Sequence, residues 1–226
     1  MKLLVLSFVF FCGCSSQEGS NIILFPRQTA TDYVIVKPTV EKQWKQLTVC
    51  LRSYTELSRA YSLFSIAMPG TGKDNTFVIY PEPPNYCYVS INQEDIKFKV
   101  DPEVLDWKHT CVTWDSSTGL VQLWINGKRY PRRVTTTRSP IGPQMSIILG
   151  QEQDSLGGGF NALESFVGEM CDVNIWDYVL PPEKITQYFY FNHNVNKNNN
   201  GWINGTYTSK GNAIILKNEF CSFYST

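Results

Sequence analysis

Short segments in which apolar and polar residues alternate recur along most of the 226-residue chain. In the segment 46–54, Leu47, Val49 and Leu51 fall on one face of an extended strand. A period of two is typical of a strand with one face on a core and the other toward water or a ligand. Similar segments, rich in Val, Ile, Thr and aromatic residues, predict strands at 33–36, 46–54, 62–67, 76–80, 87–91, 97–100, 110–114, 120–125, 145–149, 169–176 and 213–216.

Turn signals separate these strands. Asn126 and Gly127 directly follow the alternating segment 120–125, and both residues tolerate positive φ, which predicts a hairpin. Residues 181–189 alone indicate a helix, because two prolines and a glutamate open the segment and later apolar residues follow the i, i+3, i+4 spacing. About a dozen short strands with such turns predict one all-β domain of two packed antiparallel sheets.

The first residues have the pattern of a secretory signal peptide. Met1 and Lys2 precede an apolar run over 3–11, and small residues follow at 12–16. The apolar run is shorter than the roughly 20 residues that cross a bilayer. We therefore expect residues 1–16 to be removed and 17–226 to form a secreted, extracellular protein. A buried N-terminal strand and a bacterial lipobox around Cys14 are the alternatives.

Composition limits the partners of the chain. It carries 20 basic and 20 acidic residues, a formal net charge of zero. Broad binding to nucleic acid needs a basic surface, so no nucleic-acid partner is expected, although a small charged site remains compatible with this balance. No second long apolar run follows the first, which predicts a soluble mature protein that contacts membrane head groups only peripherally.

The cysteines indicate disulfide bonds. Five remain after the predicted leader: Cys50, Cys87, Cys111, Cys171 and Cys221. None lies close enough in sequence to another to match the ligand spacing of a zinc site. In an oxidising compartment this odd number leaves at least one thiol or an intermolecular bridge.

Oxygen-bearing side chains are concentrated in the glycine-rich segment 150–164, which follows the apolar strand 145–149. Glu152, Asp154, Asn161 and Glu164 lie there, and the glycines let the chain curve. Calcium takes about 6–8 oxygen ligands in flexible geometry, and the segment lacks nitrogen and sulfur ligands. It is therefore a candidate calcium site, and the alternative is a solvated acidic loop.

Two further features bear on this loop. Asp74 and Asn75, at the start of another strand, could supply ligands from across the fold, although spacing alone does not place them there. Glu152 and Asp154 could also serve a retaining glycoside hydrolase, which needs two carboxyl groups about 5–5.5 Å apart. The third carboxylate of such enzymes would fall near position 157, where the chain has Gly157, so a hydrolase is disfavoured. His109, beside Cys111 in an alternating strand, is interpreted as structural.

Residues 109–116 match the pattern His-x-Cys-x-Ser/Thr-Trp-x-Ser/Thr, on which the chain resembles the pentraxin family. The resemblance extends from about residue 25 to 216. The other matching segments are 47–50 with 54–57, 147–155 and 173–180. It implies a two-sheet antiparallel jelly-roll (lectin-like) sandwich with one short helix, assembled as a homo-oligomeric ring that is usually pentameric.

The resemblance also implies two calcium ions per subunit on one face. Asp74, Asn75, Glu152, Asp154 and the carbonyl of Gln153 would hold the first ion. The two carboxylates at 152 and 154 would bridge to the second ion, since bridging carboxylates reduce the repulsion between adjacent dications.

The second ion is where the chain departs from the family pattern. The family has an acidic residue followed three positions later by glutamine, whereas this chain has Asn161 and Glu164. We expect the second ion to bind still; in the alternative, only Glu164 ligates. The resemblance places Tyr80 and Asp95 where the family receives the quaternary ammonium of phosphocholine, with Ser90 in the same wall.

The resemblance implies a disulfide between Cys50 and Cys111. Cys171 and Cys221 are additional, and we hypothesise that they pair and tie down the C-terminal tail, which leaves Cys87 as a buried or reactive thiol. Asn204 begins the sequon Asn-Gly-Thr and is a candidate glycosylation site.

The favoured function is that of a secreted, calcium-dependent pattern-recognition protein of acute-phase type in innate immunity, and not an enzyme. It would bind phosphocholine, phosphoethanolamine or related phosphorylated or carbohydrate groups on microbes and damaged cells. A ring would strengthen weak single sites through multivalency, and complement components or phagocyte receptors would be its effector partners. The alternative is a secreted structural, storage or reproductive protein that keeps the fold without the ligand.

Overall fold

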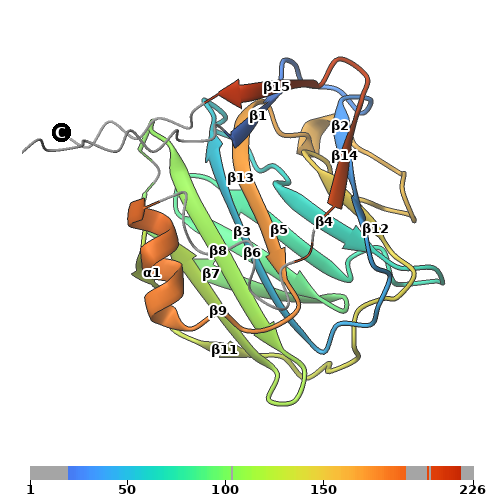
Figure 1. The fold of residues 1–226 in the computed structure, drawn as a ribbon, viewed down its shortest axis with the longest axis vertical. Helices are drawn as coiled ribbons and strands as arrows, with labels where there is room; N and C mark the ends of the chain where they lie inside the picture. The colour runs from blue at the N-terminus through green and yellow to red at the C-terminus, as the bar shows by residue number, and fades with distance from the viewer. Residues whose placement is uncertain (1–19, 103, 192–202, 204, 220–226) are drawn as a thin grey trace, which may run out of the picture.

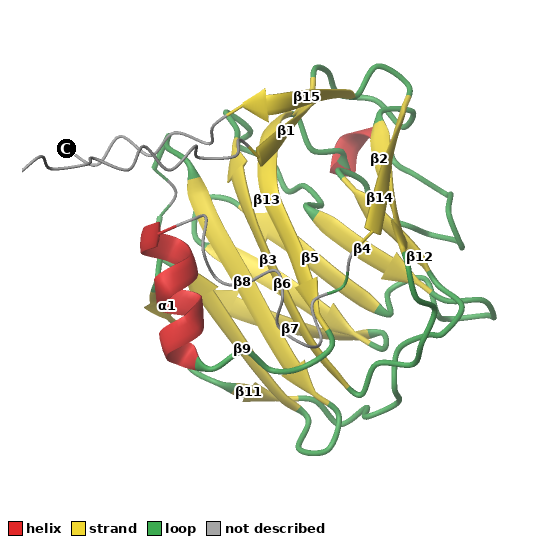
Figure 2. Cartoon of the chain, in the orientation of Figure 1, coloured by secondary structure: helices red, strands yellow, loops and turns green. Residues whose placement is uncertain are grey.

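The computed structural model describes residues 20–102, 104–191, 203 and 205–219. Two antiparallel sheets lie face to face and enclose the core, and one helix lies outside them (Figures 1 and 2). The two-sheet antiparallel jelly-roll prediction is therefore confirmed. Three sequence-based expectations lie outside the described residues: the leader over residues 1–16, the sequon at Asn204, and Cys221.

The first sheet has eight strands, and its central pairs are the longest in the molecule. Its order is β10-β9-β8-β3-β13-β1-β15, with β11 also paired to β9. The strands are β1 Ser20–Phe25, β3 Gln46–Tyr54, β8 Lys108–Asp115, β9 Leu120–Ile125, β10 Lys128–Arg129, β11 Arg133–Val134, β13 Gly168–Trp176 and β15 Ile214–Glu219.

The second sheet has seven strands in the order β14-β2-β12-β4-β5-β6-β7. These are β2 Tyr33–Pro38, β4 Phe64–Ala67, β5 Phe77–Glu82, β6 Tyr86–Ile91, β7 Glu94–Lys99, β12 Ser146–Leu149 and β14 Gly205–Lys210. The predicted hairpin after residue 125 is present, with φ of 49° at Asn126 and 75° at Gly127. The strands β1 and β14 and the two-residue strands β10 and β11 were not predicted from the pattern.

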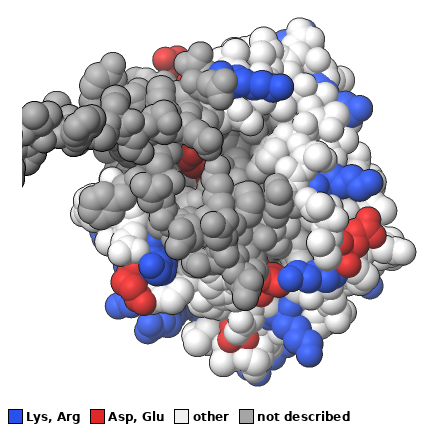
Figure 3. Space-filling model, viewed as in Figure 1, with Lys and Arg blue, Asp and Glu red and all other residues white. Residues whose placement is uncertain are grey.

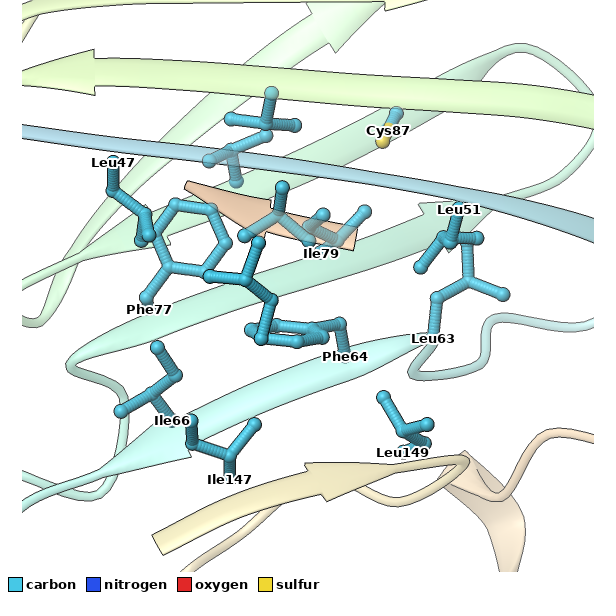
Figure 4. Packing of buried hydrophobic residues seen from close by; sticks show 14 of the residues in the cluster. Leu47, Leu51, Leu63, Phe64, Ile66, Phe77, Ile79, Cys87, Ile147 and Leu149 are labelled. Atoms are coloured by element: carbon cyan, nitrogen blue, oxygen red, sulfur yellow. The ribbon is translucent and has the colours of Figure 1, made fainter. Parts of the chain in front are cut away.

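Alternating residues of both sheets fill the space between them (Figure 4). Leu47, Val49 and Leu51 point into this core as predicted, and Phe64 and Phe77 meet them from the second sheet. The rings of Phe64 and Phe77 pack edge to face with centroids 5.8 Å apart. Burying each such side chain contributes about 1.5–3 kcal/mol, so this interior is the main source of stability.

The outer face of the first sheet is also buried, which differs from the expectation that it faces water or a ligand. The predicted helix is present as α1 (Pro182–Phe191), and it covers part of this outer face (Figure 1). Ile185 and Tyr188 of α1 pack against Trp124, Trp176 and the Cys50–Cys111 bridge. The helix therefore buries a second, smaller apolar cluster on the outer side of the first sheet.

The predicted disulfide joins Cys50 and Cys111, which lie directly opposite each other in the pair of β3 with β8. Cys171 is disulfide-bonded as well; its proposed partner at 221 lies outside the described residues. Cys87 keeps a thiol that is buried in the core, with its Sγ 3.8 Å from the carbonyl oxygen of Tyr88. Cys50, His109 and Cys111 lie close together, as the ligands of a metal ion would. Both sulfurs are used in the disulfide, so these three residues are not a metal site.

A buried arginine of the first sheet contacts both a carboxylate of the same sheet and the end of α1. Arg52 is fully buried, and its Nε lies 3.1 Å from Oδ2 of Asp172. Its Nη2 donates to the backbone carbonyls of Tyr188 at 3.0 Å and Phe189 at 2.9 Å. Asp172 has φ of 50°, within the register shift of β13, which turns its carboxylate toward the guanidinium. One arginine thus offsets the charge of a buried carboxylate and donates hydrogen bonds to carbonyls in the last turn of the helix.

His109 provides a pH-dependent part of the stability. Burial and the nearby charge of Arg52 lower the pKa of His109 to about 3, well below its ordinary value of 6.5. Between these values the unfolded chain binds a proton that the folded protein excludes, so stability rises with pH across this window. We expect wild type to lose about 2 kcal/mol of unfolding free energy through this group between pH 6.5 and 5.

The variant His109→Gln should lack this contribution, which urea unfolding at several pH values would measure. Glu152, whose pKa is raised, contributes a slope of the opposite sign in the absence of metal. The difference in unfolding free energy between variant and wild type, followed against pH, therefore gives the contribution of the His109 imidazole alone. Parallel pH curves for the two proteins would contradict this assignment.

Candidate functional site

The candidate site lies on the outer face of the second sheet, at the edge formed by the loop after β12. Side chains of β5, β6 and β7 that do not enter the core stand on this face, including Tyr80, Ser90 and Asp95. The loop over residues 150–165 folds against them. Two glutamines of this loop fix its position and thereby decide which side chains face outward.

Gln151 and Gln153 are fully buried and point inward. The Gln151 amide nitrogen donates to the backbone carbonyls of Thr29 at 2.6 Å and Asp32 at 3.0 Å. The Gln153 amide nitrogen donates to the carbonyl of Ser65 at 3.2 Å, and its oxygen accepts from the backbone N–H of Gly157 at 2.9 Å. Because neighbouring residues of an extended chain point to opposite sides, Glu152 and Asp154 are directed to the other side.

Two glycines are required for this path. At Gly150 φ is +83°, and an added Cβ would lie 2.4 Å from the ring of Phe25. At Gly159 φ is +75°, and an added Cβ would lie 2.7 Å from the Cβ of Asp154. The loop can therefore curve back over its own acidic residues only because both positions lack a side chain.

Three carboxylates meet at this place. Oxygens of Glu152, Asp154 and Glu164 all lie within 4.8 Å of one another. Burial, and then the negative charges of Asp154, Glu164, Asp74 and Asp95, raise the pKa of Glu152 to about 7. Gathering like charges in this way is unfavourable unless a cation offsets them.

Asp74 and Asn75 are brought to the same place from the start of β5. The turn between β6 and β7 holds them, because Gln93, oriented with its oxygen toward these donors, accepts from the backbone N–H of Asn75 at 2.6 Å and of Asp74 at 3.2 Å. Gln93 also donates its own N–H to the carbonyl of Asn75 at 3.0 Å. The charge of Asp74 acts on Glu152, so the two segments lie near each other, and their shared role as metal ligands stays a prediction.

The residues fit a hard divalent cation. Oε1 of Glu152 and Oδ1 of Asn75 are buried and accept no hydrogen bond from a protein donor. A buried oxygen without a partner is costly, and a cation would satisfy both atoms. The gathered groups offer only oxygen, which calcium prefers and which zinc and copper do not. The chain therefore provides a calcium-type donor set.

Asn161 has a different role in the structure from the one that the sequence suggested. Its side-chain oxygen accepts from the backbone N–H of Leu163 at 3.0 Å and caps the 3-10 helix η1 (Ala162–Glu164). This cap directs the turn that places Glu164 beside Glu152 and Asp154. Its role as a metal ligand stays a prediction.

Tyr80, Ser90 and Asp95 form a wall next to the carboxylates. Ser90 Oγ donates to Asp95 at 2.5 Å. Tyr80 is half-buried, and burial followed by the charges of Glu164 and Glu152 raises its pKa to about 12. The hydroxyl therefore stays protonated and can donate a hydrogen bond, and the carboxylate of Asp95 can accept a cation.

Arg59 belongs to the site, although no spacing pattern singled it out. Its Nη1 donates to the backbone carbonyls of Ala60 and Leu163, both at 2.9 Å, and its charge acts on the Tyr80 phenol. It therefore fixes the η1 turn to the segment before β4. On the opposite side of the molecule, which carries α1, basic and acidic side chains are interspersed around the rim (Figure 3).

Comparison with known proteins defines the class of this fold and site. The model of the Pentaxin family matches residues 21–217. Jeltraxin of Lepidobatrachus laevis is 60% identical over 222 residues, which cover 97% of this chain and 98% of its own length. C-reactive protein of Xenopus laevis is 49% identical over 223 residues, which cover 98% of this chain and 94% of its own length. The chain belongs to the pentraxin family.

A solved structure agrees with the fold. The native heptameric SAP-like pentraxin from Limulus polyphemus superimposes with a TM-score of 0.74 at 23% identity, covering 90% of this chain and 98% of its own. At this identity the likeness supports the jelly-roll sandwich alone. Among the described residues, no helix is long and apolar enough to cross a membrane.

Proposed function

We propose that this pentraxin is a secreted, calcium-dependent pattern-recognition protein of innate immunity that binds phosphocholine, phosphoethanolamine or related phosphorylated or carbohydrate groups. The observation that carries the proposal is the meeting of Glu152, Asp154 and Glu164 with Asp74 and Asn75 on the exposed outer face of a sheet. Membership of a family that includes C-reactive proteins supports recognition rather than catalysis.

The residues suggest how a ligand would be held. Asp74, Asn75, Glu152, Asp154 and Glu164 would bind calcium, together with the carbonyl of Gln153. When bound, the ions supply open coordination positions for the oxygens of a phosphate group. The remaining roles belong to the wall beside them.

The wall residues would orient the rest of the ligand. Asp95, fixed by the Ser90 hydroxyl, would attract the quaternary ammonium of choline. Tyr80 offers an aromatic surface for the methyl groups and a protonated hydroxyl. Phosphoethanolamine carries a smaller ammonium with N–H donors, so Asp95 could accept a hydrogen bond from it as well.

We expect two calcium ions per subunit, and Glu164 to be required for the second. Isothermal titration of wild type should give a stoichiometry of two, and Glu164→Gln should give one, since the pair at 161 and 164 would then carry no charge. The double variant Asn161→Asp with Glu164→Gln restores the acid-then-amide order of the family and keeps a capping oxygen. It should recover the second ion.

The exposed Glu41, far along the chain from these residues, provides a matched control. Glu41→Gln should leave the stoichiometry at two. A wild-type value of one would contradict the proposal for the second ion while leaving the first in place.

The assembly and partners follow the same reasoning. We propose a homo-oligomeric ring, with five subunits as the expectation. The Limulus relative is heptameric, so native mass spectrometry should count the subunits. A ring would present several sites to one surface and touch membrane head groups only peripherally. Complement components or phagocyte receptors are the proposed effector partners.

Retention on phosphocholine and phosphoethanolamine resins tests the function. The protein should be retained in calcium and released by a chelator. Passage through both resins in calcium, with no binding on a glycan array, would favour a structural or storage role for the same fold.

A further inference from the structure

A row of side chains leads from the candidate calcium site to the edge of the second sheet. Tyr80 of β5 lies directly opposite Tyr88 of β6, and Tyr88 lies directly opposite Lys97 of β7. Since neighbouring strands are about 4.8 Å apart, the row extends roughly 10 Å from Tyr80. Its first member lies beside the carboxylates, and its last stands on the edge strand.

The end of this row is both aromatic and cationic. Lys97 Nζ lies 3.8 Å from the ring centroid of Tyr86 and 4.9 Å from that of Tyr88. It also lies 3.4 Å from a carboxylate oxygen of Glu82. Hydrogen bonding to Tyr88, and then to Glu82, raises the pKa of Lys97, so its charge is kept.

These contacts hold the side chain of Lys97 in place without using all the hydrogen-bond donors of its ammonium group. The ammonium has three donors, and the side chains of Lys97 and Glu82 are 44% and 41% exposed. An exposed pair of this kind contributes little, so an anion can compete with Glu82 for Lys97. Because Tyr86 already fixes the ammonium, binding would cost less side-chain entropy.

We propose that Tyr88 and Lys97, with Tyr86 as a positioning residue, form a second subsite that receives an anionic sugar unit attached to the group bound at the calcium site. The inference rests on the proposed function and goes beyond it. The apolar face of a pyranose ring would stack on Tyr88, and its sulfate, phosphate or carboxylate would meet Lys97. A choline group would instead turn toward Asp95, because Lys97 repels a cation.

Two disaccharides distinguish binding at the calcium site from additional binding at the subsite of Tyr88 and Lys97. Unsulfated chondroitin disaccharide carries one uronic carboxylate, and its 6-sulfated form adds a second anion on the neighbouring sugar. Isothermal titration in calcium should show about threefold to fivefold tighter binding of the sulfated form by wild type. Lys97→Gln should reduce this preference to about one while phosphocholine binding is kept.

Variants at the aromatic position test stacking. Tyr88→Ala should weaken both disaccharides by about threefold to tenfold, whereas Tyr88→Phe, which keeps the ring, should bind both disaccharides nearly as well as wild type. Arg132, an exposed basic residue next to β11 on the other sheet, is the matched charge control. Arg132→Gln should retain the preference for the sulfated form.

The outcomes distinguish this subsite from the proposed function. Phosphocholine binding without any preference for the sulfated disaccharide, or a preference that Lys97→Gln leaves unchanged, would overturn the subsite alone. Disaccharide binding that persists in chelator would also overturn it, since the anion would then bind elsewhere. Failure to bind both phosphocholine and the disaccharides in calcium would overturn the subsite and the proposed function together.

Discussion

Replacing Glu152 with glutamine should abolish calcium-dependent binding of phosphocholine. The substitution keeps the shape of the side chain but removes the charge of a buried carboxylate whose neighbours Asp154 and Glu164 lie within 4.8 Å. Changes to groups that only support metal ligands cost about 10–100-fold in affinity, so loss of a bridging ligand should cost about 100-fold or more. Calcium titration and surface plasmon resonance on phosphocholine would measure both losses.

The same variant should remain folded, which separates a binding defect from misfolding. Burial and the charges of neighbouring carboxylates raise the pKa of Glu152, so the neutral glutamine relieves repulsion in the metal-free protein. Its melting temperature without calcium should match or exceed that of wild type, and calcium should no longer raise it. Glu41→Gln should behave as wild type throughout. Unchanged calcium affinity in Glu152→Gln would contradict the assignment of this carboxylate.

Replacing Arg52 with methionine should destabilise the protein by about 3–5 kcal/mol. The variant would leave Asp172 as a buried carboxylate without its ion-pair partner, and would remove the donors to the carbonyls of Tyr188 and Phe189. Urea unfolding would measure the change in unfolding free energy. We expect the contact between α1 and the first sheet to weaken first.

A double variant separates the ion pair from the packing. Adding Asp172→Asn to Arg52→Met removes the buried charge, and asparagine tolerates the φ of 50° at this position. The double variant should therefore be more stable than the single one. Lys128→Met, which breaks an ion pair whose side chains are 56% and 62% exposed, should cost less than about 1 kcal/mol. Equal losses of unfolding free energy in Lys128→Met and Arg52→Met would contradict this account.

Period-two patterning predicted the strands that pack on the core, and the ends of β3 fall where the pattern placed them. It missed β14, whose residues Gly205–Lys210 are mostly polar and exposed at the sheet edge, and β1, whose apolar residues follow closely after the predicted leader. The pattern also predicted that the outer face of β3 is directed toward water or a ligand. Tertiary packing decides this point, because α1 and Trp124 bury that face.

The acidic loop was predictable as a candidate cation site, since its oxygens and glycines lie close together in the sequence. The approach of Asp74 and Asn75 was not, because it depends on the register of β5 with β6 and on the turn residue Gln93. The resemblance to the pentraxin family was what predicted that Asp74 and Asn75 lie beside the acidic loop. Arg59 and the Tyr88–Lys97 row carry no local signal, because they become neighbours of the site only through pairing between strands.

Titration of phosphocholine into the wild-type protein, in calcium and in excess chelator, tests the central claim most directly. We predict saturable binding in calcium, and none in chelator, where Glu152, Asp154 and Glu164 would be left without cations. Binding of equal strength in both conditions, or none in either, would contradict a calcium-dependent recognition site.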